Sequence, residues 1–177
     1  RQAQRLRTPE EVLRCKRGTC IELALLLASC WEHIGFHPVL FLTTGHAFCG
    51  LWGSAEARER CFASLRDPIL DARCPARHAT LGGTVVNRSS VTPWMLTEPI
   101  QHDAILAAID DGSLLPVEAT YMAYKSSLRE AMHDAKENLR TAIHGAEERR
   151  LDAMLDVRTA RERGVTPLPI LTDGPVA

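Results

Sequence analysis

The sequence predicts an α+β fold in which one buried helix packs on a small antiparallel sheet. The helix is expected from about Cys20 to Gly35. Residues 21–31 are apolar almost all round, and a helix of that kind is buried on most sides. Two short apolar runs follow, residues 38–43 and 46–52, separated by Gly45. Runs of that length bounded by turn residues are typical of strands, so the helix has a sheet to pack on.

Shorter elements are expected around this core. Thr8, with Pro9 next and Glu11 three positions on, has the spacing of a capping box and begins a short helix that ends near Lys16. Further helices are expected over 55–65, 100–111 and 127–144, and strands over 114–120 and 151–157, followed by a short helix. Pro116 favours an edge position for the strand that contains it. Residues 67–99 are rich in proline and contain a Gly-Gly pair, so we expect an irregular insertion there, such as a lid or binding loop.

The length of 177 residues suits one domain with its own core, expected over residues 1–169, with 170–177 as a tail or linker. The chain lacks an initiator Met and opens on polar and basic residues without the apolar stretch of a signal peptide. We therefore expect a piece of a longer, cytoplasmic protein, with other domains of the same parent chain as partners. Asp156 and Arg158 are expected to hold the C-terminal segment in place.

The charge balance argues against two classes of partner. With 21 basic and 22 acidic residues the net charge is -1, which gives no case for direct nucleic-acid contact or for a membrane surface. The longest apolar run is too short to span a bilayer. Six cysteines fit a reducing setting, in which the thiols of Cys30 and Cys49 act as small hydrophobes. There is no Cys-x-x-Cys pair, and Cys74 with His78 is too small a ligand set, so we expect neither a metal nor another cofactor.

Cys20 is the strongest candidate for chemistry. It stands in Arg17-Gly18-Thr19-Cys20-Ile21, at the first turn of the buried helix. The positive end of the helix dipole and the unpaired backbone N–H groups there favour a negatively charged sulfur, and the Cys20 N–H is suited to stabilising an oxyanion. The alternative is a buried structural cysteine.

His46 and Glu118 complete a possible set of nucleophile, base and orienting group. His46 begins the second strand and follows Cys20 by a helix and a strand, a separation that lets the two meet in space. Glu118 stands in an otherwise apolar strand, where a carboxylate is costly to bury unless it is paired, and a histidine N–H is a natural partner. An edge-strand glutamate that faces water is the alternative for Glu118. Together the three residues have the logic of a catalytic triad.

These segments resemble the core of the transglutaminase-like superfamily. The residues that carry the resemblance are Gly18-Thr19-Cys20 with the helix to Gly35, then a strand, then Gly45-His46-Ala47-Phe48. In that superfamily a Cys on a helix, a His on one strand and an acid on the next form the active site. Val117-Glu118-Ala119-Thr120 is similar to its third motif, usually Asp followed one residue later by Thr, and Glu118 is a departure from it.

More narrowly, residues 8–169 resemble transglutaminase-like segments of large bacterial proteins, some of which also carry helicase or nuclease domains. The resemblance implies a papain-like fold, with the Cys helix packed on a sheet that bears His and Glu, and it implies thiol chemistry. It does not imply a substrate.

Four functions stay open on this evidence. A thiol hydrolase, most simply a cysteine peptidase, would use Cys20 to attack a carbonyl of a protein or peptide substrate, His46 to move the proton and Glu118 to hold the imidazole. The same residues would serve an acyltransferase that passes the acyl group to an amine. The third is a catalytically silent module that binds a peptide or a neighbouring domain, and the fourth is a metal site. Trp52, on the His46 face of its strand, and Trp94, in the long insertion, are candidate substrate-binding residues, with packing as the alternative for Trp52.

Overall fold

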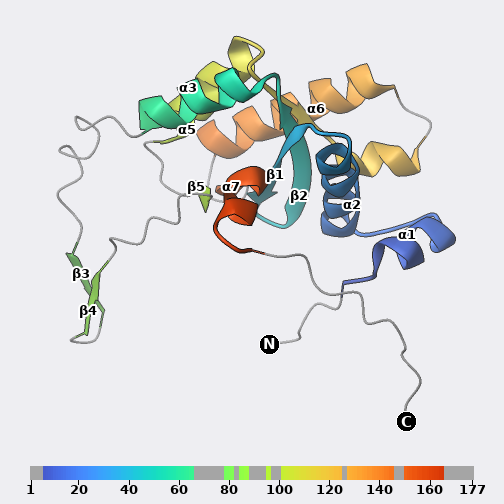
Figure 1. Cartoon of the computed structure of the whole chain (residues 1–177), viewed down its shortest axis with the longest axis horizontal. Helices are drawn as coiled ribbons and strands as arrows, with labels where there is room; N and C mark the ends of the chain where they lie inside the picture. The colour runs from blue at the N-terminus through green and yellow to red at the C-terminus, as the bar shows by residue number, and fades with distance from the viewer. Residues whose placement is uncertain are drawn as a thin grey trace.

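The structure is a computed structural model that describes residues 6–65, 78–81, 84–87, 95–96, 101–124, 127–145 and 150–165. Helices and strands are interspersed along these segments (Figure 1). Among the described residues, no helix is long and apolar enough to cross a membrane.

An antiparallel sheet forms the centre of the fold, with strand order β5-β7-β1-β2-β6. Its strands are β1 (His37–Thr43), β2 (His46–Trp52), β5 (Met95–Leu96), β6 (Leu114–Val117) and β7 (Leu151–Asp156). Strands β1 and β2 form a hairpin whose turn contains Gly45 at a φ of 74°, a left-handed conformation that favours glycine. Strand β6, which contains Pro116, lies at the edge of the sheet, so the expected edge position is confirmed.

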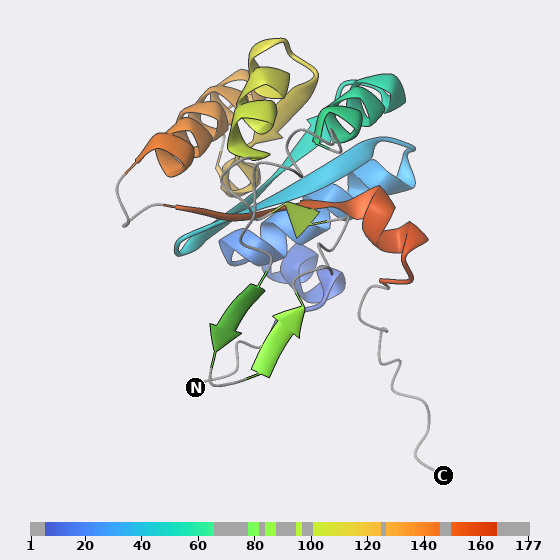
Figure 2. The ribbon, with the colours of Figure 1, turned by 90° about the vertical axis from the view of Figure 1, so that its left-hand side faces the viewer.

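Helices cover both faces of this sheet, as Figure 2 shows. On one face lie α1 (Pro9–Cys15) and α2 (Cys20–His33). The other face is covered by α3 (Ala55–Leu65), α5 (His102–Asp110) and α6 (Leu128–His144). The short helix α7 (Val157–Glu162) follows β7 directly. The predicted α+β class, with the Cys20 helix packed on an antiparallel sheet, is confirmed.

Two cores result, because successive strand residues point to opposite faces. The core under α3, α5 and α6 is built from strand residues Val39, Phe41, Phe48 and Trp52 together with Ile105 and Leu139. The core under α2 contains Leu40 and Cys49 of the strands with Leu23, Ala24 and Leu26 of the helix. Helix α2 is therefore fixed on β1 and β2 along its length.

One sequence prediction about these elements is wrong, and a second is incomplete. The strand expected over 114–120 ends at Val117, and a 3₁₀ helix, η2 (Ala119–Ala123), begins immediately after Glu118. Within the insertion expected to be irregular, β3 (His78–Leu81) and β4 (Thr84–Asn87) pair with each other, and β5 joins the main sheet beside β7. Strands β3 and β4 are separated by only two residues, the Gly82-Gly83 pair, which is a local hairpin signal that the sequence reasoning did not use. Strand β5, by contrast, depends on pairing with β7, which is distant in sequence.

Candidate active site

Cys20 occupies the first position of α2, as predicted. Its side chain is half-buried, and the helix behind it is 14 residues long. Thr19 caps the helix, and its backbone N–H donates to Glu22 Oε2 over 2.7 Å, which is one arm of a capping box. The thiol therefore stands on a turn whose backbone is held in place.

Glu22 is a buried anchor for that turn, and the sequence reasoning did not single it out. Only 5% of the residue is exposed. Its Oε1 accepts the Arg7 backbone N–H over 2.7 Å, and the Arg7 guanidinium lies 3.7 Å from Oε2. Burial on its own would raise the pKa of Glu22, but the N–H donors of Thr19 and Arg7 outweigh it and lower that pKa below its ordinary value.

This shift predicts a pH-dependent contribution to stability. A carboxylate whose pKa is depressed on folding stabilises the protein above its unfolded value of about 4.3, and the contribution is lost as the pH falls through the folded value. We expect Glu22→Gln to lower the unfolding free energy by about 1–3 kcal/mol at pH 7, with the gap to wild type closing in acid. Urea unfolding at a series of pH values from 7 to 3 measures the loss of stability at pH 7 and its dependence on pH.

Glu11 offers a matched control, because it fills the same capping-box position on α1 but is more exposed. Glu11→Gln should cost only about 0.5 kcal/mol. If the difference in unfolding free energy between wild type and Glu22→Gln stays constant down to pH 3, the depressed pKa of Glu22 is contradicted.

His46 and Glu118 meet directly. His46 Nε2 lies 2.7 Å from Glu118 Oε2, across 72 residues of sequence. Glu118 is almost fully buried, with 5% of its side chain exposed, whereas 32% of the His46 side chain is exposed. The imidazole also stacks beside Phe48, with ring centroids 5.8 Å apart. One edge of the ring thus faces a buried carboxylate while part of the ring stays open.

The backbone around Glu118 aims its carboxylate. Glu118 is the N-cap of η2, and its Oε1 accepts the backbone N–H of Thr120 over 3.1 Å and the Thr120 hydroxyl over 2.8 Å. Its own backbone N–H donates to the Ala131 carbonyl of α6 over 3.0 Å. Because Oε1 is engaged by Thr120, Oε2 is left for His46. The sequence pointed to Thr120 only through the third motif; its hydrogen bonds give it the role of a positioning residue.

The structure joins His46 to Glu118 but shows no hydrogen bond between Cys20 and either of them within the described residues. Helix α2 nevertheless packs against both β2 and η2, the elements that begin at His46 and just after Glu118. Strand alternation places His46 on the Phe48 face, whereas α2 packs on the opposite face. A contact between the thiol and the imidazole therefore has to form around the end of the sheet where β2 begins.

The other cysteines differ from Cys20. None of the five described cysteines is in a disulfide. Burial raises the pKa of Cys49 to about 12 and that of Cys61 to about 11, so both thiols stay neutral. Cys15 and Cys30 are exposed, which corrects the expectation that Cys30 packs as a small hydrophobe. Of the accessible thiols in the described segments, Cys20 alone occupies the N-terminal end of a long helix.

The burial of Trp52 favours the packing alternative over a substrate-binding role. It is only 2% exposed and belongs to the core under α3, α5 and α6. Its indole N–H donates to Asp156 Oδ2 over 2.9 Å. Trp52 does share a strand face with His46, as the alternation predicted. Beyond His46, however, that face of β2 points into the core, so Trp52 serves in packing. Trp94 lies outside the described residues, as does Cys74, and the side chain of His78 is not described.

Asp156 is the centre of a buried polar network that the sequence only partly anticipated. Besides Trp52, its carboxylate accepts from Arg58 Nε and Nη2 and from the backbone N–H and hydroxyl of Thr159. The Arg58 guanidinium also contacts the Thr159 hydroxyl. This network joins α3, β2 and α7, so Asp156 holds the C-terminal segment as expected. Arg158 instead makes an exposed pair with Glu162.

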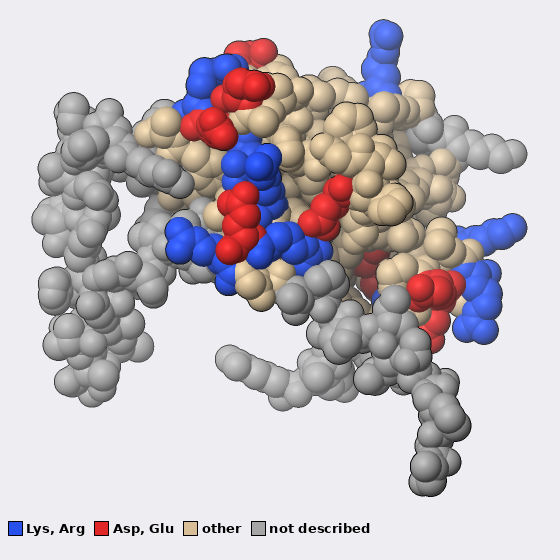
Figure 3. All heavy atoms as spheres, viewed as in Figure 1, with Lys and Arg blue, Asp and Glu red and all other residues tan. Residues whose placement is uncertain are grey.

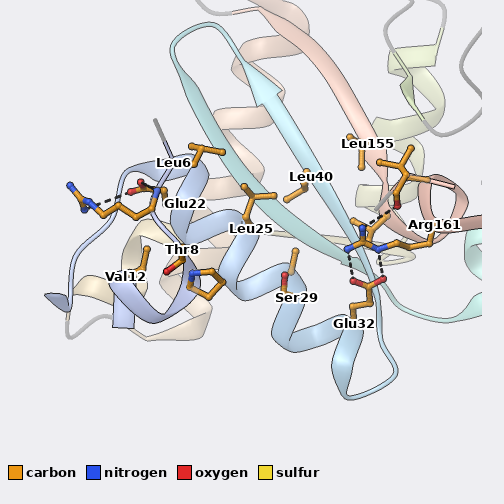
Figure 4. A pocket seen from close by; sticks show the side chains of 16 residues that line it. Leu6, Thr8, Val12, Glu22, Leu25, Ser29, Glu32, Leu40, Leu155 and Arg161 are labelled. Atoms are coloured by element: carbon orange, nitrogen blue, oxygen red, sulfur yellow. Dashed lines mark hydrogen bonds and ion pairs between the residues drawn. The ribbon is translucent and has the colours of Figure 1, made fainter. Parts of the chain in front are cut away.

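An apolar groove among the described residues is separate from these groups. It has a volume of about 420 Å³ and lies along the outer side of α2, between α1 and α7 (Figure 4). Its floor includes Leu40 and Leu155, and the Arg161–Glu32 ion pair lies at one end. Cys20, His46 and Glu118 are not among its lining residues, but Glu22 and Arg7, which are, hydrogen-bond to the segment that precedes Cys20.

Comparison with known proteins gives no match: no family model, no curated protein and no solved structure is similar to this chain. Within the described residues, no group of three or more His, Cys, Asp or Glu side chains is arranged to hold a metal ion. The function therefore has to be argued from the side chains themselves.

Proposed function

We propose that the chain is a thiol hydrolase, a cysteine peptidase that works through Cys20, His46 and Glu118. The observation that carries the proposal is the 2.7 Å contact between His46 Nε2 and a buried carboxylate whose other oxygen is already engaged by Thr120. Glu118 holds a proton on Nε2, which leaves Nδ1 as the basic nitrogen of the ring. That is how an acid orients an imidazole to serve a nucleophile.

The reaction follows from these roles. The Cys20 thiol gives its proton to His46 Nδ1 as Sγ attacks the carbonyl carbon, and the backbone N–H of Cys20 donates to the oxyanion. The C–N bond then breaks, and the proton passes from His46 to the leaving amine. Water, deprotonated by His46, attacks the thioester, the C–S bond breaks and the thiol regains its proton. Glu118 stays ionised throughout and stabilises the imidazolium.

The same arrangement supports membership of the transglutaminase-like superfamily, with its papain-like fold, as part of the proposal. The order along the chain is a Cys at the start of a helix, a His at the start of a strand and an acid at the end of the neighbouring strand. Accessible thiols such as Cys20 are kept reduced in the cytoplasm, which is the compartment we assign.

Digestion of a mixture of short unstructured peptides tests the proposed activity. Wild-type protein is expected to generate new peptide termini. Alkylation of the protein beforehand should remove this activity, and the fraction of activity lost should equal the fraction of Cys20 that mass spectrometry finds carbamidomethylated. Alkylation confined to Cys15 and Cys30 should leave it intact. Peptides that persist uncut, or cleavage that survives full modification of Cys20, would overturn the proposal. If cleavage products appear only as amides with an added amine, the activity is acyl transfer rather than hydrolysis.

Glu118→Gln is expected to lower kcat by about 10²–10⁴-fold while KM changes little. The amide keeps the volume of the side chain but removes the charge that stabilises the imidazolium, and its NH₂ group can favour the wrong tautomer of His46. Steady-state kinetics on a cleaved peptide measures the effect.

Thr120→Val is the graded comparison, because it removes one donor to Oε1 and leaves the Oε2–His46 contact in place. We expect a loss of about tenfold, equivalent to about 1.4 kcal/mol and close to the lower end of the range for one hydrogen bond to a charged group. Equal kcat values in wild type and Glu118→Gln would show that the carboxylate has no part in catalysis.

A further inference from the structure

We propose that the Cys20 site recognises acidic substrates, through a basic turn formed by residues 14–17. The inference rests on the proposed function, since it names the class of peptide that Cys20 would cleave. Arg14, Lys16 and Arg17 supply three cations within six residues of the thiol, and the segment from 14 to 20 contains no acid. The chain as a whole has a net charge of -1, so this concentration of positive charge is local.

The basic turn has a defined path toward Cys20. Lys16 ends α1 in the left-handed conformation, with a φ of 52°, and its backbone N–H donates to the Leu13 carbonyl over 3.3 Å. The Arg17 carbonyl accepts from the Arg7 guanidinium over 3.2 Å. At Gly18 an added Cβ would lie 3.3 Å from side-chain atoms of Val12 and Leu23, so the chain passes closely over the start of α2.

The three cations are available to a ligand. Arg14, Lys16 and Arg17 are exposed, and none of them forms an ion pair with an acid in the described part of the chain. The acids of α1, Glu10 and Glu11, lie one helical turn before Arg14, but neither forms an ion pair with it in the described part of the chain. Lys and Arg side chains accordingly project at the edge of the molecule over α1, outside the acidic ones (Figure 3).

Other charges around the site do not cancel this patch. Glu22 is buried and already paired with Arg7, and Glu118 is buried against His46. On the other side, beyond η2, α6 presents two acids, Glu130 and Asp134, against the single permanent cation of Arg129. The anionic group of a substrate is therefore expected on the side of the basic turn.

The distance between these cations and Cys20 determines how strongly they attract an anionic substrate. Consecutive Cα atoms are about 3.8 Å apart, so the Arg17 Cα lies within roughly 11 Å of the Cys20 Cα and the Lys16 Cα within roughly 15 Å. Those distances are comparable with a Debye length of about 10 Å at 0.1 M salt. The bound for the Arg14 Cα is larger, roughly 23 Å from the Cys20 Cα. Lys16 and Arg17, with a smaller contribution from Arg14, should change the approach rate of a singly charged anion by about two- to fivefold at low salt, and by less at high salt.

Alkylation of the thiols with iodoacetate, which is anionic, and iodoacetamide, which is neutral, tests this without requiring catalysis. Peptide mapping by mass spectrometry gives the rate ratio of the two reagents at each cysteine of the native chain. Cys30 is an internal control, because it is exposed on the same helix but near the opposite end, and Cys15 lies inside the basic turn. We expect the ratio at Cys20 and Cys15 to exceed that at Cys30 by about two- to fivefold at 20 mM salt.

The variant Arg14→Gln/Lys16→Gln/Arg17→Gln should remove the excess at Cys20, as should 0.5 M salt. It spares the backbone hydrogen bonds of the turn, so thermal unfolding should change little. With wild-type protein, peptides that carry Asp beside the cleaved bond should have a kcat/KM at least about twofold above that of matched Lys peptides. With the variant, the two kinds of peptide should have the same kcat/KM. Equal ratios at Cys20 and Cys30, or Asp and Lys peptides cleaved equally, would overturn the inference. Absence of all peptide cleavage with the excess at Cys20 intact would instead refute the proposed function alone.

Discussion

A Cys20→Ala variant is expected to lose peptide hydrolysis by a factor on the order of 10³ or more, because no other group in the proposed mechanism can form the acyl-enzyme. The variant should fold as the wild type does. Cys20 is only half-buried, alanine has the highest helix propensity, and the capping box of Thr19 and Glu22 does not involve the thiol. The loss should therefore appear in kcat with an unchanged melting temperature. Product formation from a cleaved peptide, followed by mass spectrometry, measures it.

Cys30→Ala is the matched control, since it removes an exposed thiol from the same helix at a distance from His46. We expect its hydrolysis rate to stay within about twofold of wild type, as for an ordinary surface substitution. If Cys30→Ala and Cys20→Ala lost activity equally, the thiol chemistry would have to be assigned elsewhere.

Asp156→Ala is expected to lower the unfolding free energy by about 3–5 kcal/mol, because it leaves the Arg58 guanidinium without its partner in a buried position. Only 1% of the Asp156 side chain and 11% of the Arg58 side chain are exposed. Burial on its own would raise the pKa of Asp156, but donors from Arg58 and Thr159 outweigh it and lower the pKa, so the carboxylate is charged at neutral pH. Urea unfolding at pH 7 provides the measurement.

Asp152→Ala supplies the comparison on the same strand. Asp152 pairs with Arg150 at the surface, with 42% of the Asp152 side chain and 69% of the Arg150 side chain exposed, so its removal should cost less than about 1 kcal/mol. Similar losses for Asp152→Ala and Asp156→Ala would mean that the buried network contributes no special stability.

The sequence was informative where local pattern decides structure. The apolar stretch after Thr19 predicted α2 to within a few residues, and the runs on either side of Gly45 predicted β1 and β2 almost completely. The capping box of Thr8 and Glu11 was also confirmed. In each case the hydrophobic period or a cap acts within a few neighbours, so no distant contact has to be known.

Prediction failed where partners distant in sequence decide. Val117 and Glu118 read as one continuous strand, yet the Glu118 N–H bonds to Ala131 of α6 and its carboxylate caps η2, which ends the strand. Trp52 shares a strand face with His46, but its burial depends on Phe62 of α3 and on Asp156 of β7. Strand alternation defines a face and cannot tell which part of that face is covered.

In the candidate site, too, the sequence identified residues but not the distant contacts between them. His46 and Glu118 were selected from motifs, and the structure brings them into contact across 72 residues. Thr120 was visible in the third motif, but its two hydrogen bonds to Glu118 Oε1 were not. The relation of Cys20 to His46 depends on how the first turn of α2 lies against the β1–β2 hairpin, which no local pattern describes.

Trapping of an acyl group on Cys20 tests the central claim most directly. The protein is mixed with an activated p-nitrophenyl ester, quenched in acid within seconds and analysed as intact mass and as peptides. The proposed triad predicts one acyl group per chain, located on Cys20, that forms at least about tenfold more slowly in His46→Ala. An acyl group that appears on Cys15 or Cys30 instead, or that forms on Cys20 at the same rate with and without His46, would contradict the claim that these residues form one active site.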